Sequence, residues 1–340
     1  MITRRKFLKN TAAATAVGLV SNWAAASNES DRLGAVLPMR RLIRNGEKVT
    51  AFCLGGYHLG VVEEPKEAEA IVEKSMEMGV RFYDNARRYW DGRAEDYYGR
   101  FLTPKYRDDI FLMTKSPGKT AEEAKKELED SLRAMRTDQV DLWQIHGLNT
   151  IEDVDRRLNN GVLEVFLEAK QSGKARYIGF TGHRNPKVHM YFLDFLKKRG
   201  LELDTCQLPL NVCDPSWESF EVEALPELLK REYGVIAMKT MAGGSMMGLR
   251  IDTTPKELKT VDIPNVLKDS GLTYAELHQY VYSLPVSSLC SGCITLEQVK
   301  HNVNVLKRFK GLSESEKKRL VSLAKPYAGF NVENYKRVLS

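Results

Sequence analysis

The chain has 340 residues, of which 43% are hydrophobic and 28% charged, so it can bury the core of one large domain or of two ordinary ones. Its formal net charge is +6, but the first nine residues carry four cations (Arg4, Arg5, Lys6 and Lys9), and without them the charge is +2. This balance excludes a strongly basic nucleic-acid-binding protein, and the sequence contains no basic and aromatic RNA-binding motif.

The first 26 residues contain the three parts of an export signal in the expected order. A twin-arginine segment, Thr3–Lys9, precedes a weakly apolar run, Thr11–Val20, and small residues at Ala24–Ala26 suit a cleavage site. The apolar run is too short to span a bilayer, so we expect no permanent membrane anchor. The pattern predicts a signal peptide over residues 1–26 that is read by the twin-arginine export machinery, and a mature protein in the periplasm or at the cell exterior. The alternative is a chance pair of arginines in a disordered tail.

After a linker at residues 27–38, short apolar runs alternate with longer amphipathic ones. The segment Met39–Phe52 is predicted to be a β-hairpin, because Asn45-Gly46 is a strong turn signal. The predicted strands are Ala51–Leu54, Val80–Tyr83, Ile110–Thr114, Val140–Ile145, Ala175–Phe180, Thr205–Leu208, Val235–Met238 and Val286–Leu289. The predicted helices include Pro65–Met78, Ala121–Met135, Val162–Gln171, Val188–Lys198, Phe220–Arg231 and Tyr274–Ser283. Four glycines stand at helix stops: Gly79, Gly173, Gly200 and Gly234.

Eight strands that alternate with helices favour an α/β fold, a (β/α)8 TIM barrel with an N-terminal β-hairpin and extra C-terminal helices. A doubly wound sheet is the competing fold, but the first strand is followed by Leu54–Gly60, which lacks the G-x-G-x-x-G spacing of a phosphate loop. We expect the barrel over residues 39–312 and a helical tail over 313–340, with one helix at Ser315–Ala324. The segment Gly243–Ile263 lacks clear periodicity and is expected to be a long loop that shapes the site.

Five cysteines without dense spacing do not make a disulfide framework. Cys290 and Cys293 are separated by two residues, a spacing found in redox and zinc sites. No second pair of this kind and no histidine pair completes a zinc site, so we expect no metal. Cys53 and Cys206 lie in apolar runs and are expected in the core.

Three consecutive predicted strands end at ionisable residues, namely Asp84, Lys115 and His146, and Tyr89 lies on the loop beside them. In a barrel, the carboxyl ends of the strands carry the chemistry. A phenol is a weak acid in water, and a nearby cation makes it a useful proton donor by stabilising the phenolate. Each residue also has a structural interpretation, as a turn cap, a solvated lysine, a core histidine and a packed tyrosine. Together at adjacent strand ends, they favour an acid–base site.

At these residues the sequence resembles the aldo-keto reductase superfamily, from about Met39 to Leu312. The segments that carry the resemblance are Asp84–Gly99 and Leu132–His146. The resemblance implies a catalytic tetrad of Asp84, Tyr89, Lys115 and His146. It also implies hydride transfer from a reduced nicotinamide to a carbonyl carbon while Tyr89 acts as general acid. Lys115 then lowers the pKa of Tyr89, Asp84 holds Lys115, and His146 orients the carbonyl oxygen.

The same resemblance implies the residues that hold the cofactor. Gly55, Gly56 and Tyr57 match the loop that approaches the nicotinamide, and Thr181, Gly182 and Gln207 match the segments that bind its carboxamide. The phosphate and adenosine end is matched by Lys239, Gly292, Cys293, Thr295, Gln298 and Asn302. Leu210 replaces the aromatic residue expected to stack on the nicotinamide. Gln298 and His301 stand where the family often has Arg and Glu, which weakens the case for binding a 2′-phosphate.

We nevertheless expect NADP(H) as the cofactor, because Lys239 or Lys300 could compensate for the missing Arg. NAD(H) is the alternative. The substrate is a small carbonyl or alcohol, and Arg87, Arg88, Trp90 and Arg184 near the rim would suit a sugar or sugar acid. Because nicotinamide cofactors are scarce outside the cytoplasm, a second hypothesis is a permanently bound cofactor that is oxidised and reduced within one catalytic cycle. A third hypothesis is a nucleotide-binding barrel without turnover.

Overall fold

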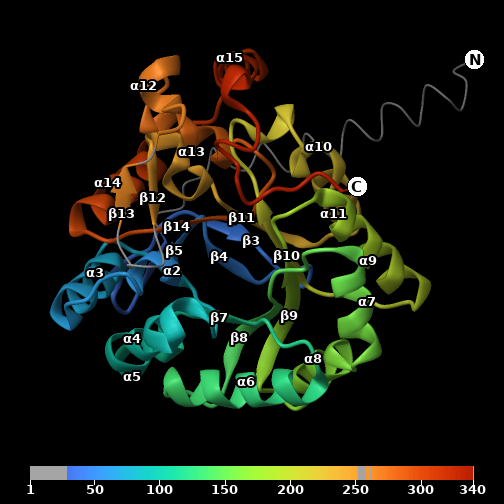
Figure 1. Ribbon diagram of the computed structural model, residues 1–340. Coiled ribbons are helices and arrows are strands. Elements are labelled where there is room, and N and C mark those ends of the chain that lie inside the picture. The colour runs from blue at the N-terminus through green and yellow to red at the C-terminus, as the bar shows by residue number, and fades with distance from the viewer. Residues whose placement is uncertain (1–28, 252–257, 261, 340) are drawn as a thin grey trace, which may run out of the picture.

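The computed structural model describes residues 29–251, 258–260 and 262–339, and at its centre eight parallel strands close a barrel (Figure 1). The strands follow one another in chain order around the barrel, and the last pairs with the first. They are β5 (Phe52–Gly55), β6 (Phe82–Asp84), β7 (Phe111–Ser116), β8 (Val140–Ile145), β9 (Ala175–Thr181), β10 (Thr205–Pro209), β11 (Gly234–Met238) and β14 (Ser288–Gly292). All eight predicted strands are confirmed, and with them the (β/α)8 fold.

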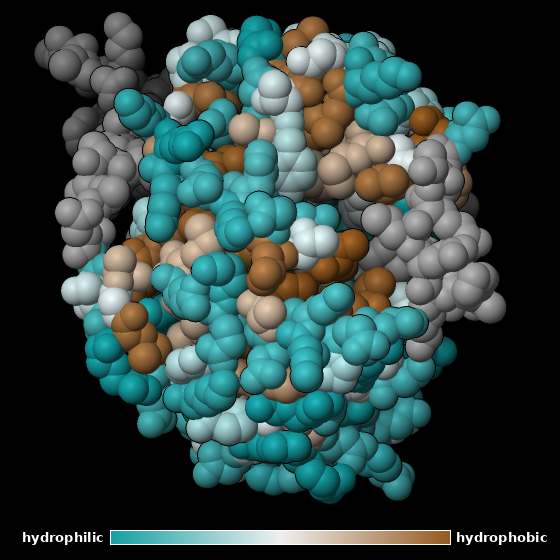
Figure 2. All heavy atoms as spheres, turned by 90° about the vertical axis from the view of Figure 1, so that its left-hand side faces the viewer, coloured by the Kyte–Doolittle hydropathy of each residue, from teal (hydrophilic) through white to brown (hydrophobic). Residues whose placement is uncertain are grey.

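Helices surround the barrel (Figure 1). The longer ones are α3 (Pro65–Glu77), α4 (Arg93–Phe101), α6 (Ala121–Ala134), α7 (Ile151–Asn159), α8 (Val162–Gln171), α9 (Pro186–Lys198), α13 (Tyr274–Tyr282), α14 (Leu296–Arg308) and α15 (Glu314–Ala324). Shorter helices are α2 (Gly56–Leu59), α5 (Thr103–Tyr106), α10 (Phe220–Glu223), α11 (Leu225–Lys230) and α12 (Val266–Ser270). Short 3-10 segments are η2 (Tyr89–Gly92), η3 (Arg107–Asp109), η4 (Asp214–Ser216), η5 (Ala242–Met247) and η6 (Lys325–Tyr327), of which η2 and η5 are kinked. On the face that includes α3 and α14, polar residues cover most of the surface, and apolar ones are exposed in its middle (Figure 2).

Two details of the predicted helices are wrong. The segment Phe220–Arg231 forms two helices, α10 and α11, because Pro226 in the first turn of α11 has no N–H to continue the ladder from α10. Gly234 does not stop a helix; it begins β11, where a Cβ would lie 2.0 Å from the Leu42 carbonyl oxygen. The residue after α11 in the left-handed region is Glu232, with φ 58°. The other three glycines do have positive φ at helix ends, as predicted: Gly79, Gly173 and Gly200.

The N-terminal hairpin closes the amino end of the barrel. Its strands β3 (Met39–Arg41) and β4 (Lys48–Thr50) are antiparallel, which confirms the prediction for this segment. Hairpin side chains Leu42, Ile43 and Val49 pack in one cluster with the residues that fill the barrel interior, among them Phe82, Phe111, Leu142 and Ile236. The hydrophobic effect therefore holds the hairpin against the strands. A larger cluster lies between the outer faces of the strands and the helices.

The expected linker and the expected long loop both contain strands. Within residues 27–38, β1 (Ser30–Asp31) pairs with β2 (Gly34–Ala35), and Asp31 forms an ion pair with Arg81 at 2.6 Å. Within Gly243–Ile263, β12 (Leu249–Ile251) pairs with β13 (Leu258–Thr260). Neither segment has enough alternating apolar residues to reveal such short strands. Residues 252–257 and 261 of that segment lie outside the described residues.

The C-terminal tail folds back onto the barrel. After α15, which agrees with the predicted Ser315–Ala324 helix, the chain returns to the loops at the carboxyl ends of the strands. There the Lys336 ammonium donates to Asp214 Oδ1 at 2.7 Å, and the Arg337 amide donates to the Arg184 carbonyl at 2.7 Å. The tail thus covers part of the rim at which barrel chemistry is expected.

The predicted signal peptide, residues 1–26, lies outside the described residues, and so export stays a prediction. Within the described ranges, none of the helices has the length and apolar character needed to cross a membrane.

Candidate active site

The carboxyl ends of three neighbouring strands carry three of the predicted catalytic side chains. Asp84 is the last residue of β6, Lys115 is the penultimate residue of β7, and His146 directly follows β8. The strands β6, β7 and β8 pair in parallel, so these ends lie at one rim. Tyr89 begins the turn η2 on the loop after β6. All four side chains line the same cavity.

Lys115 is the centre of this group. Its ammonium forms an ion pair with the Asp84 carboxylate, donates to the Asn85 carbonyl at 2.7 Å and lies 3.3 Å from the Tyr89 hydroxyl. Lys115 is 1% exposed and Asp84 is 3% exposed, so the charges are shielded from solvent. A buried ammonium needs such partners, because its desolvation is otherwise costly. The structure therefore supplies the cation beside Tyr89 that the sequence suggested.

Burial and charge together set the protonation of this pair. Burial lowers the pKa of Lys115, but the negative charge of Asp84 raises it, and the net pKa is above the ordinary value. Burial raises the pKa of Tyr89, and the Lys115 charge opposes this rise without cancelling it. The contribution of Lys115 thus has the expected sign, but the net pKa of Tyr89 is raised rather than lowered. At neutral pH the site holds a charged lysine beside a protonated phenol.

His146 faces Tyr89 and is neutral. The two rings meet edge to face with centroids 5.7 Å apart. Burial, and then the charge of Lys115, hold the pKa of His146 well below its ordinary value. Its backbone is fixed by a hydrogen bond from the Arg157 guanidinium to its carbonyl at 3.1 Å. A neutral imidazole at this place can donate one hydrogen bond to a group between itself and Tyr89.

A strained turn presents Tyr89 to the cavity. The two residues after it, Trp90 and Asp91, have φ of 54° and 57°, which is uncommon for residues with side chains. The Trp90 indole donates to the Tyr57 carbonyl at 2.6 Å, and this ties the turn to the short helix α2. The ring of Tyr57 packs edge-on against Tyr89, with centroids 5.2 Å apart. Tertiary contacts therefore hold the phenol in a conformation that local sequence does not favour.

The cavity that these residues line has a volume of about 440 Å³. Seven of the predicted cofactor residues also line it: Gly55, Tyr57, Thr181, Gln207, Lys239, Gly292 and Gln298. Several lining residues escaped the sequence reasoning, among them His58, Tyr274, Cys290, Met247 and Leu249. His58 lies within the glycine-rich Leu54–Gly60 segment, which was a usable signal. Met247 and Leu249 belong to the Gly243–Ile263 segment that was expected to shape the site, and Cys290 belongs to the C-x-x-C pair, although its place in the wall was not predicted. Tyr274, at the start of α13, had no sequence signal.

The other five predicted cofactor residues do not line the cavity. Gly56 packs against the backbone, since a Cβ there would lie 2.7 Å from the Asp84 carbonyl oxygen. Gly182 packs against the His189 ring, since a Cβ there would lie 2.6 Å from its Cε1 atom. Thr295 caps α14 by accepting from the Gln298 amide.

Cys293 and Asn302 are fully buried behind the wall. The Asn302 amide donates to Cys293 Sγ at 3.3 Å and accepts from the Tyr274 hydroxyl at 2.7 Å. Their contacts support Tyr274, which is part of the wall. The structure therefore gives this predicted pair a supporting position behind the cavity.

Two polar groups in the wall fit the carboxamide of a nicotinamide. Gln207 is 1% exposed, and its side-chain oxygen is buried without a hydrogen-bond partner among the described residues. A buried carbonyl oxygen of this kind is suited to accept from an amide N–H. The Thr181 hydroxyl accepts from the Gly147 amide at 3.1 Å, which leaves its own proton free to donate. Together they offer the acceptor and the donor that a carboxamide requires.

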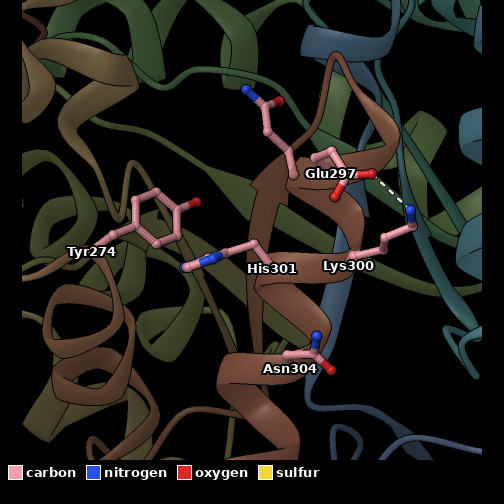
Figure 3. A pocket seen from close by; sticks show the side chains of 6 residues that line it. Tyr274, Glu297, Lys300, His301 and Asn304 are labelled. Atoms are coloured by element: carbon pink, nitrogen blue, oxygen red, sulfur yellow. Dashed lines mark hydrogen bonds and ion pairs between the residues drawn. The ribbon is translucent and has the colours of Figure 1, made fainter.

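A second cavity of about 490 Å³ lies at the start of α14 (Figure 3). In Figure 3 the Tyr274 and His301 side chains lie next to each other, and their ring centroids are 4.8 Å apart in an edge-to-face contact. The Lys300 ammonium and the Glu297 carboxylate, joined by the dashed line, are 2.7 Å apart. Tyr274 and Gln298 line both cavities, so the two are adjacent. A helix start with a nearby cation suits a phosphate-bearing end of an extended ligand.

A family model described as the aldo/keto reductase family matches residues 51–325. The chain belongs to this family. Its members bind nicotinamide nucleotides, and the family identifies the protein as an oxidoreductase that interconverts carbonyls and alcohols. Within the described residues, no cluster of three or more His, Cys, Asp or Glu side chains could hold a metal ion.

Several curated relatives of this aldo/keto reductase are named as oxidoreductases, dehydrogenases or reductases. The uncharacterized oxidoreductase YqkF of Bacillus subtilis is 28% identical over 84% of this chain and 96% of its own length. The L-galactose dehydrogenase of Arabidopsis thaliana is 26% identical over 81% of this chain and 90% of its own. Among solved structures, the holo form of aldo-keto reductase AKR11C1 from Bacillus halodurans has a TM-score of 0.68. It is 23% identical over 87% of this chain and 99% of its own, so this likeness concerns the fold.

Proposed function

We propose that this protein is a nicotinamide-dependent oxidoreductase in which Tyr89 exchanges a proton with the substrate oxygen while hydride is transferred at the carbon. The observation that carries the proposal is the part-buried contact of Tyr89 with Lys115, which Asp84 keeps charged. The 440 Å³ cavity would hold a nicotinamide, which would supply or accept the hydride when bound. The protein residues position the substrate and stabilise charge.

The protonation of the site supports carbonyl reduction at neutral pH. Tyr89 is protonated, so it can donate to the oxygen of a carbonyl that gains negative charge. The adjacent Lys115 ammonium stabilises the phenolate that remains. Neutral His146 donates a hydrogen bond that orients the same oxygen. For alcohol oxidation the steps reverse, and Tyr89 must first lose its proton.

We propose NADP(H) as the cofactor; Thr181 and Gln207 would hold the carboxamide of its nicotinamide, and the residues that line the cavity of Figure 3 would hold its adenosine end. Lys300 in that cavity offers a charge to a 2′-phosphate, although Glu297 competes for it. Titration of nicotinamide fluorescence with NADPH and NADH tests the preference. Lys300→Ala should weaken NADPH binding several-fold, on the order of one exposed charge pair, and leave NADH unaffected. Lys307→Ala, an exposed lysine of the same helix, is the control.

The substrate that we propose is a polyhydroxylated carbonyl or alcohol such as a sugar. Two relatives support this by name, the L-galactose dehydrogenase and a 6-dehydroglucose reductase of Novosphingobium aromaticivorans, which is 27% identical over 44% of this chain and 53% of its own. Of the rim residues expected to contact substrate, Arg87 is engaged by the buried Glu95, and Trp90 is 8% exposed. Arg88 is exposed beside Tyr89 and stays available. A panel of aldoses, sugar acids and simple aldehydes would rank these classes.

The decisive experiment is Tyr89→Phe. We expect kcat to fall by about 10²- to 10⁴-fold, because the proton donor is lost, while nucleotide binding is retained. Tyr191→Phe, which removes a hydroxyl bonded to Asp155 on the outer helices, should leave kcat unchanged. Turnover by Tyr89→Phe at the wild-type rate would refute the proposed role of Tyr89. Nucleotide binding without turnover in the wild-type protein would favour a barrel that only binds nucleotide.

We also propose export through the twin-arginine route, with support from the sequence of residues 1–26 alone. Changing Arg4 and Arg5 to Lys should retain the protein in the cytoplasm, as measured by cell fractionation. Because that route carries folded proteins, the cofactor can be loaded before export. Denaturing the exported protein without added nucleotide should then release nicotinamide, and an empty spectrum would contradict a permanently held cofactor.

A further inference from the structure

A thiol contacts the proposed catalytic carboxylate on the side opposite Lys115. The Lys115 ammonium contacts Oδ1 of Asp84, and Cys290 Sγ lies 3.4 Å from Oδ2. Asp84 is 3% exposed. Among the described residues, the hydrogen-bond donor to its Oδ2 atom is the Cys290 thiol. A buried carboxylate oxygen that loses its donor is costly. The orientation of Asp84 therefore depends on both neighbours.

The barrel register fixes the position of Cys290. On the paired strands β14 and β5, Cys290 lies opposite Cys53, whose thiol donates to the Leu54 carbonyl at 3.9 Å. A Cβ on Gly55 would lie 3.2 Å from Cys290 Sγ, so the glycine leaves room for the sulfur beside the cavity. Cys293, by contrast, accepts from Asn302 behind the wall. The two cysteines of the C-x-x-C segment thus contact different groups, Asp84 and Asn302, and do not form a redox pair.

Both thiols keep their protons. Burial raises the pKa of Cys53 well above its ordinary value. For Cys290, the neighbouring Cys53 thiol lowers the pKa, but burial and the charge of Asp84 outweigh it, and the net pKa is raised. At neutral pH Cys290 therefore carries an S–H group, and the adjacent carboxylate oxygen can accept only from a protonated thiol.

We propose that Cys290 is a positioning residue, whose thiol holds Asp84 in the orientation that directs Oδ1 at Lys115. The inference rests on the proposed function, since it assumes that Lys115 stabilises the Tyr89 phenolate. Without the thiol donor, the Asp84 carboxylate can turn toward other donors, and the Lys115 ammonium then follows it away from Tyr89. The phenolate is consequently less stable, and its formation requires a higher pH.

The test compares Cys290→Val, which has a similar volume and no donor, with Cys290→Ser, which keeps a donor. The rate of alcohol oxidation against pH is the main readout, because this direction needs the Tyr89 phenolate. In Cys290→Val we expect the midpoint to move to higher pH and the neutral rate to fall roughly three- to tenfold, which corresponds to one hydrogen bond. KM should change little, and Cys290→Ser should restore the profile. Cys206→Ala, at another fully buried barrel cysteine, is the control. A Cys290→Val profile that superimposes on that of the wild type would overturn the proposal.

A second measurement separates this inference from the proposed function and needs no activity. The infrared S–H stretching band of Cys290, isolated by subtracting the spectrum of Cys290→Ser, should lie at lower frequency than that of Cys206. Cys206 has no hydrogen-bond partner among the described residues, whereas Cys290 donates to a carboxylate. Equal frequencies would refute the thiol contact, even if the valine variant does not fold. If no variant and no wild-type sample turns over, the proposed function fails while this band still decides the contact.

Discussion

At the scale of single residues, the ion pair between Asp84 and Lys115 links stability to the proposed chemistry. Both side chains are almost fully buried, at 3% and 1% exposure. A buried pair is weak evidence of net stabilisation, because desolvation offsets the attraction, yet removal of one partner leaves an uncompensated charge. The pair is therefore expected to be sensitive to single substitutions.

Asp84→Asn tests this sensitivity. We expect the free energy of unfolding to fall by about 3–5 kcal/mol, because the Lys115 ammonium loses its counter-charge in a buried site. Urea unfolding measures the change. Asp130→Asn, in a partly exposed pair with Lys126 on α6, should cost less than about 1 kcal/mol. Equal effects of the two substitutions would contradict the burial argument.

Gly92, at the end of the Tyr89 turn, has a left-handed backbone and leaves no room for a side chain. Gly92 has φ 90°, and a Cβ there would lie 1.9 Å from the Arg87 guanidinium. Gly92→Ala should therefore cost about 1–2 kcal/mol of backbone strain, and it should also displace Arg87 and lower kcat. Gly173→Ala, with φ 79° and no atom near the added Cβ, should show the strain alone. Thermal unfolding and turnover of both variants measure these effects. An unchanged kcat in Gly92→Ala would show that the position of Arg87 beside the Tyr89 turn does not affect catalysis.

At the scale of elements, a buried charge cluster fastens the C-terminal tail. Lys336, Asp214 and Glu333 are each 0% exposed, and the ammonium lies 2.7 Å from Asp214 and 3.0 Å from Glu333. The cluster joins the tail to the loop after β10. Nearby, the Tyr335 ring lies 5.7 Å from the Lys239 ammonium, which lines the cavity. The tail is thus coupled to the cavity wall.

Lys336→Met removes the cation from two buried carboxylates. We expect it to destabilise the protein by about 3–5 kcal/mol and to increase proteolysis at the tail before global unfolding. Lys126→Met, at a side chain that is 75% exposed, should change stability by less than about 1 kcal/mol. Chemical denaturation together with limited proteolysis would measure both effects. A tail that stays protected in Lys336→Met would show that its other contacts suffice.

At the scale of the whole molecule, buried histidines make stability depend on pH. His189 and His278 are fully buried, and burial lowers the pKa of His189 to about 4 and of His278 to about 3. In the unfolded chain both have a pKa near ~6.5. Above that pH both states are neutral, and the stability is fully present. As the pH falls below it, the unfolded state takes up protons first, and stability is lost.

We predict a loss on the order of 4 kcal/mol from these two groups between pH 7 and pH 5. Unfolding midpoints in urea across this range measure it. His189→Gln and His278→Gln should each reduce the slope near pH 5 by about 1.4 kcal/mol per pH unit. Parallel slopes in all variants would contradict the linkage.

The order of apolar and amphipathic segments was enough to predict the barrel and the rim at which its candidate site lies. Alternation of apolar runs and helical patterns is a local property, so it predicts the eight strands and most of the outer helices. Since parallel strands bring their carboxyl ends together, the ends at Asp84 and Lys115, with His146 directly after β8, also predict a common rim. A single residue type can give a wrong prediction when it is present for another reason. Gly234 was expected to end a helix, but it is a glycine because a side chain there would collide with the Leu42 carbonyl.

Contacts between residues distant along the chain could be recognised only in the folded molecule. The thiol of Cys290 reaches Asp84 across 206 positions, and Lys336 reaches Asp214 across 122. The net protonation of Tyr89 likewise depends on burial, which outweighs the Lys115 charge that the sequence had suggested would dominate. Periodicity reports which face of an element is apolar, whereas distance, desolvation and hydrogen bonding depend on which faces finally meet.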